Sequence, residues 1–213
     1  ANQTVLITET LLDSKSLFLT ANNNTVYNMV WLDLKDGPLV MEMAPGALGP
    51  IDDYWFRWVS DVGVTGPDKG KGGKYLLLPP GYQGEVPEGY FVVRPRTMGN
   101  LMFFRTFLKD GDPKPGVEMV KKLLRIYPLA QSANPPPMKF VDVSGKAFST
   151  LAPADYSAFE YVNHVIQSEP TDALDPDTAG VFASIGIEKG KPFVPDDRMK
   201  KILTEAAAVG DAT

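Results

Sequence analysis

The chain has no cysteine and only one histidine, His164, among its 213 residues. The lack of cysteine excludes disulfides, thiol catalysis and thiolate zinc sites, and a single histidine excludes His-rich metal sites. No apolar run approaches the roughly 18 residues that a membrane-spanning helix needs. The first residues, ANQTVLITET, lack the charged start and apolar centre of a signal peptide. The sequence therefore predicts no metal centre, no cofactor and no transmembrane segment.

A strong excess of charge of either sign is also missing. Charged residues make up 22% of the chain and the net charge is −5, so no extended basic surface is available for a phosphate backbone. Nucleic acid is not an expected partner. Hydrophobic residues make up 44% of the chain, which is enough for the core of one large domain or two small ones.

Two patterns divide the sequence near Leu108. Before it, short runs rich in Val, Tyr, Trp, Phe and Leu alternate with Gly and Pro, which predicts antiparallel strands. The runs are TVYNMVWLDL, PLVMEM, DYWFRWVSD, KYLLLPP, YFVVRP and LMFFRTFL. We expect an α+β chain with an antiparallel β-sandwich or jelly-roll core over about residues 20–108. Residues 1–108 are then mostly strand and residues 109–213 mostly helix.

Four helices are expected after Leu108. The first opens on Asp112 and Pro113 and continues through residues 112–129, with apolar positions up to Tyr127. The others cover residues 153–169, 175–186 and 195–210. Between the first and second, three prolines at 135–137 forbid a helix, and MKFVDV at 138–143 can add a strand.

Several stretches carry long, distinctive motifs, among them LFLTANNNTVYNMVWLDLKDGP, YWFRWVSDVGVTGPDKGKGGKYLLLPPGYQGEVPEGYFVVRPRT and IYPLAQSANPPPMKF. In these motifs the chain resembles the DUF1254 region of the bacterial DUF1254/DUF1214 proteins, a family of unknown function. The resemblance covers nearly the whole chain. It implies a longer protein in which a DUF1214 domain follows, and a periplasmic or secreted location. One departure is Asn24, where the family often has an aspartate.

The segment DYWFRWVSD is expected to be one strand with two different faces. Tyr54, Phe56, Trp58 and Ser60 form the core face, and Asp53, Trp55, Arg57, Val59 and Asp61 form the other. Arg57 then needs a partner, because an isolated charge in a packed sheet is strongly disfavoured. Arg105, within LMFFRTFL, needs one for the same reason. Either both arginines border one polar pocket, or each pairs with a buried carboxylate such as Asp33, Asp53 or Asp61.

Three consecutive asparagines, Asn22, Asn23 and Asn24, precede the most strand-like segment. Asparagine favours turns, so the triplet can simply lead the chain into the strand. It also places donors and acceptors at a strand entrance, where sheet proteins often bind ligands. We predict that at least one of the three faces the pocket of Arg57, with Tyr27 beneath it.

Three classes of function follow from these residues. In an envelope enzyme acting on a polar small molecule or glycan, Arg57 or Arg105 fixes an anionic group, and Tyr27 or Asp61 handles a proton. In a non-catalytic binding module, the aromatic rings of Trp31, Trp55 and Tyr54 suit stacking on sugars or aromatic ligands. In a structural domain, the apolar strand face packs on a DUF1214 partner. A homo-oligomer is compatible with each class.

Overall fold

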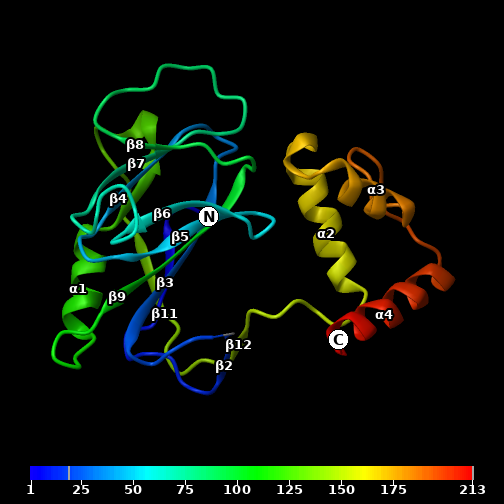
Figure 1. The fold of residues 1–213 in the computed structure, drawn as a ribbon, viewed down its shortest axis with the longest axis horizontal. Coiled ribbons are helices and arrows are strands. Elements are labelled where there is room, and N and C mark those ends of the chain that lie inside the picture. The colour runs from blue at the N-terminus through cyan, green and yellow to red at the C-terminus, as the bar shows by residue number, and fades with distance from the viewer. Residues whose placement is uncertain (19, 213) are drawn as a thin grey trace. The chain divides into compact units, whose positions relative to one another are not determined.

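The computed structural model describes residues 1–18 and 20–212. The chain folds into two compact units, Ala1–Ser149 and Thr150–Thr213. The first unit contains all of the strands and one α-helix of the described chain, and the second contains three α-helices (Figure 1). The expected α+β class is confirmed. The change of pattern near Leu108 marks the first helix rather than the end of the first unit.

The first unit contains a six-stranded sheet with the order β11-β1-β3-β9-β5-β6. Its strands are β1 (Thr4–Ile7), β3 (Thr25–Asp33), β5 (Leu48–Asp53), β6 (Trp58–Gly63), β9 (Gly99–Phe107) and β11 (Lys139–Asp142). The longest pairing joins β3 and β9 from Thr25↔Phe107 to Asp33↔Gly99. The two long strands therefore form the centre of the sheet, and the hairpin of β5 and β6 extends it on one side.

A second sheet has four strands in the order β10-β4-β7-β8. They are β4 (Leu39–Met43), β7 (Gly73–Leu77), β8 (Phe91–Val93) and β10 (Arg125–Pro128). A two-stranded sheet joins β2 (Ser16–Leu17) to β12 (Phe148–Ser149). Most pairings are antiparallel, but β1 with β11, β7 with β8 and β2 with β12 are parallel. That the strands form a β-sandwich or jelly roll stays a prediction.

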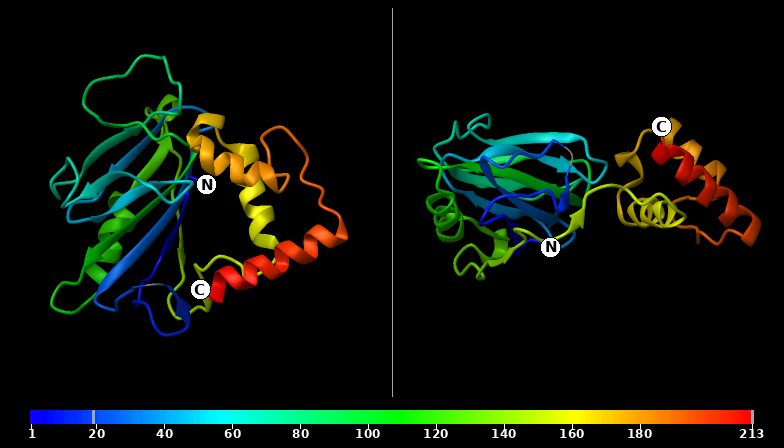
Figure 2. Two further views of the ribbon diagram at one scale, coloured as in Figure 1. Left: turned by 45° about the vertical axis from the view of Figure 1, so that its right-hand side comes forward. Right: turned by 90° about the horizontal axis from the view of Figure 1, so that it is seen from below.

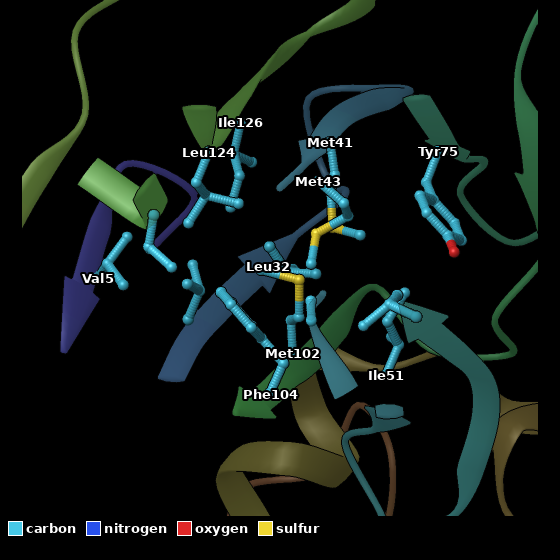
Figure 3. Close-up of a cluster of buried hydrophobic side chains, with 14 of the residues drawn as sticks. Val5, Leu32, Met41, Met43, Ile51, Tyr75, Met102, Phe104, Leu124 and Ile126 are labelled. Atoms are coloured by element: carbon cyan, nitrogen blue, oxygen red, sulfur yellow. The ribbon is translucent and has the colours of Figure 1, made fainter. Parts of the chain in front are cut away.

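One hydrophobic cluster takes side chains from both large sheets. Figure 3 shows Met41 and Met43 of β4 pointing toward Met102 of β9 within it. Helix α1 (Lys114–Leu123) adds Val117 and Val120, and it lies alongside the strands in both views of Figure 2. Flexible thioethers fill irregular gaps between packed layers, which suits this position. The core thus fixes the positions of the strands that carry the candidate site.

Two predictions about elements were wrong. DYWFRWVSD is not one strand: β5 ends at Asp53, a turn follows, and β6 begins at Trp58. Phe56 in that turn has a φ of +60°, and both Phe56 and Trp58 are exposed rather than part of the core. The first helix ends at Leu123, and Tyr127 lies in β10, which pairs with β4.

The second unit contains α2 (Ser157–Ser168), α3 (Pro176–Ser184) and α4 (Asp197–Ala212). Short 3₁₀ turns occur at Leu129–Gln131 in the first unit and Thr171–Ala173 in the second. Asp175 caps α3, since its carboxylate accepts the backbone N–H of Thr178 at 2.8 Å. Within the described part of the chain, no helix combines the length and apolar character needed to cross a bilayer.

Candidate functional site

The turn between β5 and β6 is organised by Asp53, which is only 4% exposed. Its Oδ1 accepts the backbone N–H of Trp55 at 2.8 Å and that of Arg57 at 3.0 Å. The backbone N–H of Asp53 donates in turn to the carbonyl oxygen of Arg57 at 2.8 Å. A carboxylate that accepts hydrogen bonds from the next few backbone amides is a common way to close a tight turn.

Arg57 pairs with the same carboxylate. Its Nε and Nη2 both lie 2.7 Å from Oδ2 of Asp53, and its side chain is 38% exposed. This is the ion-pair alternative that the sequence left open. The pair holds the guanidinium in one orientation, because a planar fork with two contacts has little freedom to rotate.

The turn is attached to the segment that leads into β9. The backbone N–H of Tyr54 donates to Oγ1 of Thr97 at 3.1 Å, and this hydroxyl donates to the carbonyl oxygen of Gly99 at 2.7 Å. A Cβ atom at Gly99 would lie 2.5 Å from the Tyr54 ring. The ring therefore packs directly on the backbone of β9, and the turn is held next to residues 94–96.

The turn between β5 and β6 and residues 94–96 line an open pocket of about 270 Å³. Its lining residues are Asp53, Arg57, Trp58, Val59, Arg94, Pro95 and Arg96. The lining thus contains three arginines and one acidic residue, Asp53, whose carboxylate is bonded to Arg57. Arg94 is exposed and forms no ion pair within the described part of the chain. The pocket is cationic.

The sequence contains one feature that could have indicated this pocket, the run Arg94-Pro95-Arg96, but the strand and turn patterns alone did not identify it. In the run Arg94-Pro95-Arg96, the proline is buried and both arginines are exposed. Residues two apart in an extended segment lie on the same side. A buried proline between two arginines therefore anchors a pair of cations at the surface.

The outer face of the six-stranded sheet continues from the pocket. Register places Trp31, Leu101, Asp52 and Trp58 in one row across β3, β9, β5 and β6. Trp58 is 66% exposed, and its Nε1–H donates to Oδ1 of Asp61 at 3.3 Å. Burial, followed by the charges of Asp53 and Asp61, raises the pKa of Asp52 above its ordinary value of 3.8. Two carboxylates therefore lie beside an exposed indole.

The asparagine triplet forms a separate cluster at the other end of β3. Oδ1 of Asn22 accepts the backbone N–H of Asn24 at 3.1 Å and the hydroxyl of Thr25 at 2.8 Å. The backbone N–H of Asn22 donates to the Tyr27 hydroxyl at 2.9 Å. The guanidinium of Arg105 lies 6.0 Å from the centre of the Tyr27 ring. Asn22 thus closes the turn, and Tyr27 and Arg105 pack together across β3 and β9.

The structure does not bring Arg57 and Arg105 into one pocket. Asp53, which holds Arg57, pairs with Asn100, and Arg105 lies five residues further along β9, roughly 17 Å away. Asn22 and Asn23 line a different shallow pocket, beside β2. The prediction of a common pocket for the triplet, Tyr27 and Arg57 was therefore wrong, because Asn22 bonds its own turn and Arg57 pairs with Asp53.

The two residues predicted to handle a proton also lie apart. Tyr27 is on β3 and Asp61 is on β6, with β9 and β5 between them, so roughly 14 Å separates their strands. Trp31 lies in the row of Trp58 and contacts the Tyr54 ring at 6.3 Å between centroids. The ring of Trp55 is half-buried and is not part of the lining of the cationic pocket. The predicted site residues therefore form two groups, one around the turn between β5 and β6 and one around the asparagine triplet.

Two tyrosine–carboxylate pairs occur elsewhere in the first unit. The Tyr75 hydroxyl donates to Oδ1 of Asp68 at 2.5 Å, and the Tyr127 hydroxyl donates to Oε1 of Glu42 at 2.6 Å. Burial, together with the hydrogen-bonded carboxylate, raises the pKa of both tyrosines. The second pair links β10 to β4, and the first joins β7 to the loop that precedes it.

Comparison with known proteins identifies the family and the fold. The model of the family described as protein of unknown function (DUF1254) matches residues 1–128. The crystal structure of the VPA0106 protein from Vibrio parahaemolyticus is similar, with a TM-score of 0.61 and 22% sequence identity over 91% of this chain. The match spans 48% of that protein's chain. No curated protein sequence matches. At this identity the likeness establishes the fold alone.

Proposed function

The chain belongs to the DUF1254 family of proteins of unknown function, and from that premise we propose that its first unit is a binding module for a small anionic molecule. The observation that carries the proposal is the pocket in which Arg57, Arg94 and Arg96 surround a space beside the exposed Trp58. The one carboxylate among the described residues of that lining is already paired with Arg57. Because the lining contains three arginines and one aspartate, its net positive charge favours an anionic ligand.

The chemistry of the three arginines supports this choice. A guanidinium presents a rigid fork of N–H donors that matches carboxylate and phosphate oxygens. Asp53 orients Arg57 in advance, which reduces the entropy lost when a ligand binds. The pocket volume of about 270 Å³ lies just below the range of roughly 300–1,000 Å³ that is usual for small-molecule sites, so only a small ligand fits.

An enzyme is supported less well. Acid–base catalysis needs its groups within hydrogen-bond reach of one substrate, about 2.6–3.2 Å from the proton that moves. Tyr27 and Asp61 lie on strands separated by two others. The binding module requires no such pair.

A second candidate is an interaction domain, which the exposed outer face of the six-stranded sheet favours. Trp31, Trp58 and Phe107 are each more than half exposed on this face. Exposed large apolar side chains gathered on one face often mark a protein interface. We keep a DUF1214 partner and a periplasmic or secreted location as proposals that rest on the family resemblance, and a homo-oligomer as a separate proposal.

The binding proposal is tested by titrating the protein with citrate and inorganic phosphate while following tryptophan fluorescence and heat. We expect Arg94→Gln/Arg96→Gln to lower the affinity at least tenfold, since a hydrogen bond to a charged group contributes about 1.5–3 kcal/mol. The matched control is Lys69→Gln/Lys71→Gln, which removes the same charge from an exposed loop outside the pocket. Equal losses in both variants, or no saturable binding to the unmodified protein, would overturn the proposal.

A further inference from the structure

We infer that the first unit has a second binding site, which takes a small aromatic carboxylate and which the side chain of Phe18 fills in this structure. The site lies on the outer face of the six-stranded sheet, over Tyr27 of β3 and Phe103 of β9, with Arg105 beside Tyr27. None of these residues lines the cationic pocket, so the inference is independent of the proposed function. Phe18 is an internal substitute for the ring of the ligand.

The ring of Phe18 packs on two rings of the sheet. Its centre lies 5.3 Å from the centre of the Phe103 ring, with 24° between the two ring planes, and 5.5 Å from the centre of the Tyr27 ring. The rings of Tyr27 and Phe103 themselves have centres 5.4 Å apart. Aromatic rings attract one another at such separations. Tyr27 and Phe103 therefore form an aromatic floor that binds a flat ring.

Arg105 supplies a positive charge beside this floor. It lies directly opposite Tyr27 in the pairing of β3 with β9, and its guanidinium is 6.0 Å from the centre of the Tyr27 ring. Among the residues that the structure describes, its side chain has no partner for a hydrogen bond or an ion pair. Its N–H donors are thus available to a carboxylate, which a guanidinium binds through two parallel hydrogen bonds.

The strand that carries Phe18 is short and lies between two strained residues. Strand β2 pairs with β12 over only two residues. Leu11 and Thr20, before and after it in the chain, have φ angles of +75° and +59°, a region that costs energy for residues other than glycine. A shallow pocket of about 330 Å³ adjoins the ring, since Phe18 is one of its lining residues. The ring therefore has space into which a ligand can displace it.

The floor and the arginine together define the ligand. Its ring takes the position of a phenylalanine ring, so it is flat and apolar. Its acidic group reaches Arg105, which flanks the same floor. A neutral aromatic compound gains only the contacts with the floor, and an acid without a ring gains only the charge attraction and leaves the floor uncovered. Both are therefore weaker ligands than an aromatic carboxylate.

The experiment uses phenylacetate, compared with phenylethanol, which lacks the charge, and acetate, which lacks the ring. Calorimetry and the methyl NMR signal of Met29, which lies opposite Phe103 in the register, follow the titration of the unmodified protein. We expect phenylacetate to bind about tenfold more tightly than either analogue and to shift the Met29 signal. Arg105→Gln should lower the affinity for phenylacetate about tenfold, since a hydrogen bond to a charged group is lost. Phe18→Leu should raise it about fivefold, because leucine competes for the floor without aromatic stacking.

Two control variants match these changes. Lys109→Gln removes a positive charge from an exposed position just after β9, and Leu17→Ala shortens the exposed neighbour of Phe18 in β2. Both should leave the affinity within about twofold. Binding that persists in Arg105→Gln, or that leaves the Met29 signal in place, would mean that phenylacetate binds elsewhere and would overturn the inference. A loss of affinity in Phe18→Leu would also overturn it, because Phe18 would then be part of the site. The absence of binding to both the unmodified protein and Phe18→Leu would do the same.

Discussion

Replacing Arg57 with methionine tests whether the arginine stabilises the fold or serves only the ligand. Methionine fills a similar volume but removes the guanidinium. Oδ2 of Asp53 then loses its two contacts at 2.7 Å, while Oδ1 keeps the backbone N–H groups of Trp55 and residue 57. A carboxylate in a residue that is 4% exposed is left half satisfied.

The cost follows from these contacts. Removing one partner of a buried ion pair destabilises a protein by about 3–5 kcal/mol. The side chain of Arg57 is 38% exposed, so water can enter the space it leaves and recover part of that cost. We therefore expect the free energy of unfolding to fall by about 2–3 kcal/mol.

Urea denaturation followed by tryptophan fluorescence measures this change in the first unit, since Trp31, Trp55 and Trp58 all lie within it. The control Arg94→Met should change stability by no more than about 0.5 kcal/mol, because Arg94 is exposed. In an Asp53→Asn background, the cost of Arg57→Met should be smaller by at least about 1 kcal/mol. If Arg57→Met matched Arg94→Met, the ion pair would contribute nothing to the fold.

Two further predictions concern polar side chains of the six-stranded sheet. Asp52→Asn should stabilise the protein at pH 7, because the raised pKa of Asp52 means that the folded state favours the neutral carboxyl group. The gain in stability of the variant should shrink as the pH falls through the raised pKa, and it should vanish below 3.8, where the carboxyl group is protonated in both states. Urea titrations at pH 7 and pH 4 check this, and a pH-independent difference would contradict it. Asn28→Leu should raise the free energy of unfolding by about 1 kcal/mol. Oδ1 of the fully buried Asn28 accepts no hydrogen bond from the described residues, and leucine removes only the two long contacts of Nδ2, at 3.4 Å to the carbonyl oxygen of Val26 and 3.5 Å to that of Phe104. A loss of stability in calorimetry would instead indicate that leucine does not fit.

The strands that could be predicted are those with a clear alternation or apolar run. TVYNMVWLDL was predicted to be a strand, and Val26, Val30 and Leu32, which lie on one face of β3, are buried in the core. The segment after Asp53 could not be assigned in the same way, because aromatic residues favour strands by composition alone. What ends the strand is the carboxylate of Asp53, which accepts two backbone N–H groups within the next four residues.

Tyr127 was misassigned for a related reason. Its spacing from Val120 and Leu124 suits a helix, but Leu124 adopts an extended backbone and β10 pairs with β4. The pairing of β10 with β4 thus overrides the helical spacing of these apolar residues. The site residues show the same limit. Arg57 was predicted to need a partner and pairs with Asp53, one of the candidate carboxylates, whereas its proximity to Arg94 depends on the contact between Tyr54 and Thr97.

The pairing of β1 with β11 has a consequence for how the chain is made. Thr4 lies opposite Lys139, so one edge of β1 stays without its neighbour until about 135 further residues have been synthesised. At ribosomal rates of about 5–20 residues per second, that interval is roughly 7–27 s. An open strand edge is a template for unwanted pairing with other chains. A nascent chain stopped at residue 128, where the family match ends, still lacks this neighbour, so we expect it to depend on a chaperone that shields β1.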